Sequence, residues 1–168
     1  MDLILRHFRR MARFNAWANE RIFAACRKLP EVEYLKTRPA FFKSIHGTLN
    51  HILVVDRLWL GRMRGTPHGI HALDQELYPE FLGLHVARQA EDALLISYVD
   101  GLGSNELAAS VSFNSLKGER YAMPRELLLS NLFNHQTHHR GQAHGLLSQT
   151  GVAPPDLDLV VFAHEQDQ

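Results

Sequence analysis

Residues 125–149 read RELLLSNLFNHQTHHRGQAHGLLSQ, and this stretch decides both the fold class and the candidate site. Pro124 suits the first turn of a helix, and Gly151 is placed to end one. No proline interrupts the chain between them, and Leu128 and Leu132 recur at a helical spacing. The stretch therefore predicts a long helix with one face turned inward.

Three further stretches carry apolar residues at alternating spacings of three and four, which is the pattern of an amphipathic helix. These stretches are Asp2–Leu29, Pro39–Met63 and Pro79–Asp100. Asp2 can cap the first helix, and Gly65 is a natural end for the second. Four long helices predict an all-α fold, an antiparallel four-helix bundle.

The segments between these helices are rich in turn residues. Residues 66–77 contain a proline and a glycine without a sustained period, which predicts a connection. Residues 108–113 and 119–121 flank a stretch whose Asn, Ser and Gly suit a turn, so we expect a short β-hairpin between the third and fourth helices. The tail after Gly151 is expected to be extended and packed on the bundle.

The composition is that of an ordinary globular protein. A chain of 168 residues is long enough for one domain with its own core, and we expect a single domain over residues 1–168. Eighteen basic residues balance eighteen acidic ones, which argues against a nucleic-acid partner. No apolar run approaches the roughly 20 residues of a membrane helix, so no membrane partner is expected.

The single cysteine, Cys26, excludes an internal disulfide and fits a reducing compartment. The N-terminus lacks the continuous apolar segment of a signal peptide. We therefore expect the protein in the cytoplasm. A lone cysteine beside two alanines is typical of a small buried side chain rather than a nucleophile.

Eleven histidines are the unusual feature of the composition. His135 and His139 differ by four residues, so they lie about 40° apart around a helix and can bind one ion from successive turns. His138 shares a polar, small-residue face that suits solvent, a contact behind the ligands or another subunit. His144 points nearly opposite to His135. The sequence therefore favours the first two as ligands.

A third ligand has to come from another helix. His46 and His51 in the second helix are about 140° apart, so at most one of them can serve a shared ion. His51 lies at the edge of the apolar face, whereas we expect His46 to be exposed or to line an entrance. His85 in the third helix lies on an inward stripe and stays open. The alternative to any metal site is a set of polar core residues without an ion.

Several motifs together resemble the DinB-like family, also called DinB/YfiT, of metal-binding four-helix proteins. The most specific motif is NHQTHHRGQ at 134–142. The others are FNAWAN at 14–19, SIHGTLNHILVVDRLWL at 44–60, and Arg88 with Glu91 and Asp92. Phe14 stands where the family often has tyrosine. The family name comes from DNA-damage-inducible genes and does not indicate chemistry on DNA.

The resemblance implies that His51, His135 and His139 hold a divalent metal ion, and that the chain forms a homodimer. Imidazole ligands suit zinc, nickel, copper or iron, and we take zinc or nickel as the expected ion. Some relatives use a low-molecular-weight thiol such as bacillithiol, mycothiol or glutathione. The protein would then act on a small-molecule substrate with such a thiol as co-substrate.

Three imidazoles leave a tetrahedral ion with one open position, which is typical of catalytic zinc. Our leading hypothesis is a metal-dependent thiol (S-)transferase. Hydrolysis by metal-activated water is a second enzymatic hypothesis. A metal-dependent stress-response module that binds without turnover is the contrasting one.

No catalytic residue stands out beyond the metal ligands. Asp56 points about 140° away from His51 and is a poor general base. We expect Trp17 and Trp59 to serve in core or dimer packing. Asn15, Arg88 and Asp92 could form a polar network near the site, and an ion pair four residues apart on one helix is the simpler interpretation.

Overall fold

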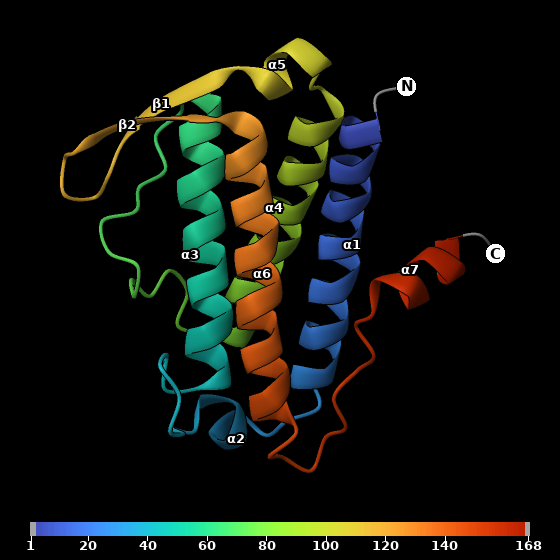
Figure 1. The fold of residues 1–168 in the computed structure, drawn as a ribbon. Helices are drawn as coiled ribbons and strands as arrows, with labels where there is room; N and C mark the ends of the chain where they lie inside the picture. The colour runs from blue at the N-terminus through green and yellow to red at the C-terminus, as the bar shows by residue number, and fades with distance from the viewer. Residues whose placement is uncertain (1–2, 167–168) are drawn as a thin grey trace.

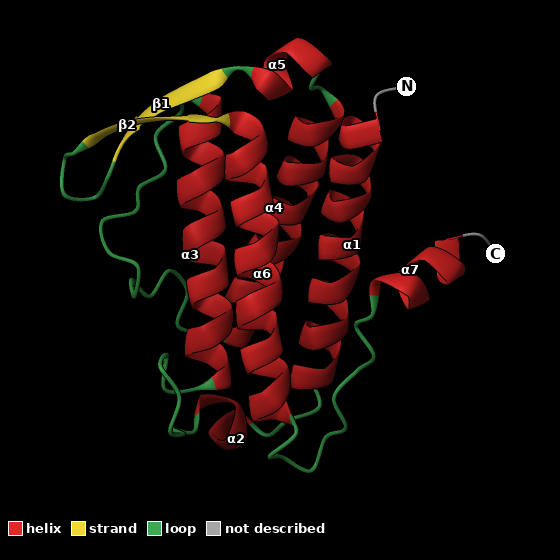
Figure 2. Cartoon of the chain, in the orientation of Figure 1, coloured by secondary structure: helices red, strands yellow, loops and turns green. Residues whose placement is uncertain are grey.

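The computed structural model describes residues 3–166, so the predicted cap at Asp2 lies outside the described residues. The chain is mostly helical with one β-hairpin, as predicted (Figure 2). The elements are α1 Leu3–Cys26, α2 Glu31–Leu35, α3 Ile45–Arg64, α4 Phe81–Asp100, α5 Ser104–Ala108, β1 Ser110–Asn114, β2 Arg120–Pro124, α6 Arg125–Leu147 and α7 Leu159–Gln166. None of the helices in residues 3–166 has the length and apolarity to cross a membrane.

The four long helices α1, α3, α4 and α6 lie side by side (Figure 1). Helix α3 runs antiparallel to α6, but it runs parallel to α4, since Asp56 contacts Arg88 and, further along both helices, Met63 contacts Tyr98. Residues 65–80 return along the outside of the molecule and make this direction possible. The expected all-antiparallel arrangement is therefore wrong for this pair of helices. It is also wrong for α1 and α6, which run parallel, since Phe8 contacts Phe133 and, further along both helices, Asn15 contacts Arg140.

The second long helix begins at Ile45, and the predicted start near Pro39 is wrong. The Ser44 hydroxyl accepts a hydrogen bond from the Gly47 amide and caps the helix. Lys43, directly before the cap, has a φ of 66°, which is outside the right-handed helical region, so a helix cannot continue through this residue. The C-terminal end is as predicted, because Gly65 adopts the left-handed conformation there.

The tail after Gly151 is not wholly extended, because it ends in helix α7. Phe162 of α7 is buried against Phe14 and Trp17 of α1, at ring distances of 5.9 and 5.6 Å. A short helix gains most of its stability from such tertiary contacts. This explains why its sequence alone gave no helical signal.

The predicted hairpin is present, shifted by a few residues. Strands β1 and β2 pair antiparallel, with Val111 opposite Met123. Gly118 in the turn has a φ of 87°, a conformation that glycine adopts without steric cost. The hairpin extends past the end of α3, so its turn reaches the side of the molecule away from α1 (Figure 1).

Two apolar clusters fill the space between the four long helices, one toward each end. A layer of buried polar side chains separates them, and every long helix contributes to it. We call it the polar ring. Its members are Asn15 and Asn19 of α1, Asp56 of α3, Arg88 and Asp92 of α4, and Gln136 and Arg140 of α6.

One side of the polar ring is built on Arg88. Its Nη1 donates to Asp56 over 2.5 Å, and its Nη2 lies 2.9 Å from Asp92. The same Asp92 carboxylate accepts hydrogen bonds from the amides of Asn15 and Asn19. Burial raises the pKa of Asp56 to about 7 against the opposing effect of Arg88, so its charged form depends on this arginine.

The other side of the ring closes through Arg140. Its Nη1 donates to the Asn15 and Asn19 side-chain oxygens over 2.7 and 3.0 Å, and to Gln136 over 3.3 Å. Gln136 in turn donates to Asp56. The predicted polar network of Asn15, Arg88 and Asp92 is therefore confirmed, and it contains the predicted ion pair between Arg88 and Asp92.

We expect Arg88→Met to lower the free energy of unfolding by about 3–5 kcal/mol, because it leaves two buried carboxylates without their cation. Urea denaturation at neutral pH measures the change. The matched control is Arg13→Met, which removes an exposed pair with Asp100 and should cost about 1 kcal/mol or less. Equal losses in the two variants would contradict this account of the polar ring.

Candidate metal centre

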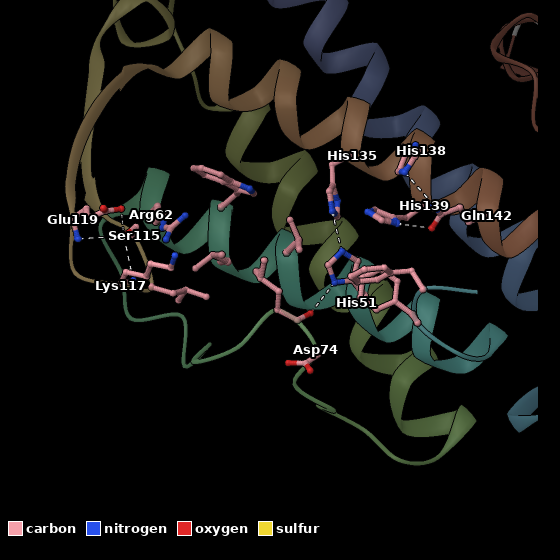
Figure 3. Close-up of a pocket in the computed structure, with 17 residues that line it drawn as sticks. His51, Arg62, Asp74, Ser115, Lys117, Glu119, His135, His138, His139 and Gln142 are labelled. Atoms are coloured by element: carbon pink, nitrogen blue, oxygen red, sulfur yellow. Dashed lines mark hydrogen bonds between the residues drawn. The ribbon is translucent and has the colours of Figure 1, made fainter. Parts of the chain in front are cut away.

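The three predicted ligands lie together where α3 faces α6 (Figure 3). His51 comes from α3, and His135 and His139 come from successive turns of α6. One nitrogen from each ring lies within 4.8 Å of the other two, and His51 Nε2 is 3.1 Å from His135 Nε2. Neighbouring nitrogens around a tetrahedral zinc lie about 3.3 Å apart, so His51 and His135 already have this spacing, and the three rings together could hold one ion.

The other candidate histidines lie outside this cluster. His138 is exposed beside His139, and His144 Nε2 bonds the carbonyl of Pro155 instead. His85 is buried between Glu20 and Arg27, in contact with both. The open alternative of a ligand from the third helix is therefore not supported by the geometry.

The prediction that His46 is exposed or lines an entrance is wrong. Its side chain is buried, and its Nδ1 lies 3.1 Å from the Tyr34 hydroxyl. Tyr34 belongs to α2, a short helix that the sequence reading did not identify. The cover over His46 thus comes from an element that packs across the start of α3.

Hydrogen bonds behind two of the histidines fix which nitrogen faces the cluster. His51 Nδ1 lies 2.7 Å from the Leu73 carbonyl oxygen, which can only accept, so Nδ1 carries the hydrogen. His139 Nδ1 lies 2.8 Å from Gln142 Oε1 and donates to it in the same way. Both rings therefore present the Nε2 lone pair, and such outer contacts are what orient metal-binding histidines.

The hydrogen bonding of His135 gives separate support for a metal ion. Its Nδ1 is buried without a hydrogen-bond partner in the described part of the chain. Its Nε2 lies 3.1 Å from His51 Nε2. Whichever nitrogen carries the hydrogen, this ring is left incompletely satisfied, and a buried unsatisfied polar atom is costly. An ion that accepts a lone pair from this ring fits the donor set.

The electrostatics keep the cluster in the form that binds metal. Burial lowers the pKa values of His51 and His139, and it lowers the pKa of His135 to about 3 with help from the neighbouring imidazoles. The three rings are therefore neutral at pH 7. A neutral imidazole is the ligand form of histidine.

Phe42 is a site residue that the sequence reading missed. Its ring stacks on His51 with centroids 3.8 Å apart, and its edge meets His139 at 5.4 Å. Gly47 allows this approach, because a Cβ there would lie 2.2 Å from the Phe42 carbonyl oxygen. The available signal was an aromatic pair, Phe41 and Phe42, directly before the helix cap.

A cavity of about 900 Å³ opens beside the three histidines. Its walls come from α3, α6, the loop after α3 and the turn of the hairpin. Trp59 packs against the apolar cluster at the hairpin end, as expected of a core residue, and its partly exposed side chain also lines this cavity. Trp17 packs against Phe14 and the C-terminal helix. The volume is that of a small-molecule site.

Helix α6 separates the histidines from the polar ring. His135 is followed by Gln136, and His139 by Arg140, so each ligand has a ring member as its chain neighbour. Asp56 belongs to the ring, where its Oδ2 accepts hydrogen bonds from Arg88 and Gln136, as its predicted direction away from His51 implies. The polar ring thus fixes the rotation of α6 without entering the cavity.

Cys26 lies in the apolar core, as expected. Burial raises the pKa of its thiol to about 12, so the thiol stays protonated at neutral pH. A protonated, buried thiol is a poor nucleophile. The cysteine therefore plays no part in the candidate site.

Comparison with known proteins places the chain in a family. The profile of the DinB family matches residues 5–168. Protein DinB of Bacillus subtilis (strain 168) is 28% identical over 155 residues, which cover 89% of this chain and 90% of that protein. The family match extends over nearly the whole sequence and includes all three histidines. The chain therefore belongs to the DinB family.

Proposed function

We propose that His51, His135 and His139 hold a divalent ion, zinc or nickel, and that the protein uses it to transfer a low-molecular-weight thiol to a small electrophile. One observation supports this above others. Three neutral imidazoles converge at the wall of a 900 Å³ cavity, so a substrate can approach the ion from the cavity side. A three-histidine site with an accessible position is typical of catalytic rather than structural zinc.

The protein's own residues prepare this site. The Leu73 carbonyl and Gln142 hold His51 and His139 in the ligand tautomer. Phe42 covers one side of the cluster and limits the access of water. When bound, the ion would lower the pKa of a coordinated thiol so that it reacts as a thiolate.

The reaction balances without a further cofactor. The sulfur of the thiol forms a bond to an electrophilic carbon, and the leaving group departs with the proton that the thiol gives up. The apolar walls of the cavity, including Leu58 and Trp59, would hold the electrophile. The homodimer and the cytoplasmic location stay predictions.

We expect the wild-type protein to bind about one divalent ion per chain, and His135→Ala/His139→Ala to lose it, because one imidazole cannot retain the ion. Elemental analysis after dialysis measures the content. The matched control is His7→Ala/His144→Ala, which removes two imidazoles outside the cluster and should keep the ion. Equal metal content in the two double variants would contradict the metal site.

The lowered pKa values predict an acid-sensitive protein. In the unfolded chain histidine protonates near pH 6.5, whereas burial keeps His135 neutral down to about pH 3 and lowers the pKa of the other two. Below about pH 6.5 these histidines are protonated in the unfolded chain while they stay neutral in the folded protein. The unfolded state then binds more protons than the folded state, so the metal-free protein loses stability as the pH falls below about 6.5.

Urea unfolding at several pH values, with a chelator present, measures this dependence. His135→Ala/His139→Ala should flatten it, and His7→Ala/His144→Ala should keep most of it. If removing the two cluster histidines left the slope unchanged, the acid sensitivity would have another source.

Turnover tests the transferase directly. The metal-loaded protein is mixed with bacillithiol, mycothiol or glutathione and a chromogenic electrophile. With at least one of these thiols, we expect the wild-type protein to consume the electrophile about 100-fold faster than the His135→Ala/His139→Ala variant does. This is a modest acceleration by enzymatic standards. Metal binding with no acceleration by any thiol would overturn the transferase in favour of a binding module. Thiol-independent consumption of the electrophile would favour hydrolysis.

A further inference from the structure

The cavity has a second polar end, away from the histidines. His51, Val55, Leu58 and Arg62 of α3 all line it. Their spacings of four, three and four place them on one stripe of the helix, and Arg62 lies about 16 Å further along the axis than His51. Figure 3 shows Arg62 with the hairpin turn at one end of the cavity and the three histidines at the other.

Arg62 is held rigidly at this end. Its guanidinium lies against two aromatic rings that contact each other edge to face, 4.7 Å from the centroid of Trp59 and 4.8 Å from that of Phe113. Its Nη2 donates to the Asn114 carbonyl over 2.9 Å. Stacking of this kind fixes the plane of the guanidinium before any ligand arrives.

The same guanidinium lacks an anion. It forms no ion pair with a carboxylate in residues 3–166, and its Nε is buried without a hydrogen-bond partner there. Burial also lowers its pKa, which shows that lost hydration is not compensated by negative charge. Arg88, by contrast, contacts two carboxylates. An anion from outside would complete the environment of Arg62.

The hairpin turn adds a second cation. Lys117 lines the same end and is exposed, with no ion pair among the described residues. Glu119 also lines this end, and its Oε2 accepts hydrogen bonds from Tyr121 and Ser115 within the hairpin, so it forms no ion pair with either cation among the described residues. The two cations are therefore available to a ligand.

We propose that the Arg62 end of the cavity binds a carboxylate of an elongated substrate, whose apolar middle lies along Leu58 and Trp59 and whose other end reaches the three histidines. The proposal rests on the proposed function for the metal end only. It names the substrate class as molecules with a carboxylate separated from the reacting group by an apolar segment. Arginine suits this role, because its planar fork matches a carboxylate.

Mercaptoalkanoates of graded chain length test the proposal, since they carry a thiol at one end and a carboxylate at the other. Matching mercaptoalcohols replace the carboxylate with a neutral hydroxyl, and plain alkanoates lack the thiol. Their affinities for the metal-loaded protein are measured by calorimetry. We expect the best mercaptoalkanoate to bind at least about tenfold more tightly than its alcohol, as a charge-assisted hydrogen bond implies.

Variants of Arg62 assign the difference to this residue. Arg62→Met should abolish the preference for the carboxylate while leaving the affinity for the alcohol unchanged, and Arg62→Lys should restore part of it. Arg64→Met is the matched control, because Arg64 is exposed two residues along and does not line the cavity. It should keep the full preference.

The outcomes separate this inference from the proposed function. Equal binding of acid and alcohol, or equal weakening of both by Arg62→Met, would overturn the carboxylate site while leaving thiol binding at the metal intact. Plain alkanoates that bind as tightly as the mercaptoalkanoates, in an Arg62-dependent way, would support the carboxylate site. That result would count against thiolate binding at the ion.

Discussion

The four long helices depend on one another through the polar ring, in which Arg88 and Arg140 are each held by groups from other helices. Apolar packing alone tolerates small rotations and shifts between helices, because it has no direction. A buried cation satisfied by partners on other helices has a single acceptable register, since any shift leaves a charge without its partner. The ring lies between the two apolar clusters, so it sets the register where all four helices meet.

That register positions the candidate metal centre. Because Gln136 and Arg140 must point into the polar ring, their chain neighbours His135 and His139 are turned toward α3, where His51 faces them. Helix α6 thus contributes Gln136 and Arg140 to the polar ring, and it contributes the residues just before them, His135 and His139, to the candidate site. A rigid scaffold behind the ligands is what a site needs to hold three nitrogens close together before an ion arrives.

The cavity has chemically different ends on one continuous wall. The stripe from His51 to Arg62 on α3 joins a metal-binding end to a cationic end through an apolar middle. Such an arrangement would select ligands by length and by the charge at the far end, whereas an ion held by the three histidines would supply the reactivity. Ligand specificity would then depend on Arg62 and the reaction on the three histidines, so a substitution at one end of the cavity could change one property and keep the other.

The sequence predicts the local features: the four long helices, the stop at Gly65, the hairpin, and the pairing of His135 with His139. Helical periodicity, turn residues and i, i+4 spacing all depend on residues that are close together in the chain. The sequence also favoured His51 over His46, since their positions relative to the apolar stripe differ. Four features could not be predicted in this way: the parallel course of α3 and α4, the late start of α3, the helix α7 packed by Phe162, and the approach of Phe42 to His51. These depend on contacts between segments distant in the chain, and such contacts leave no periodic trace in the sequence of either partner.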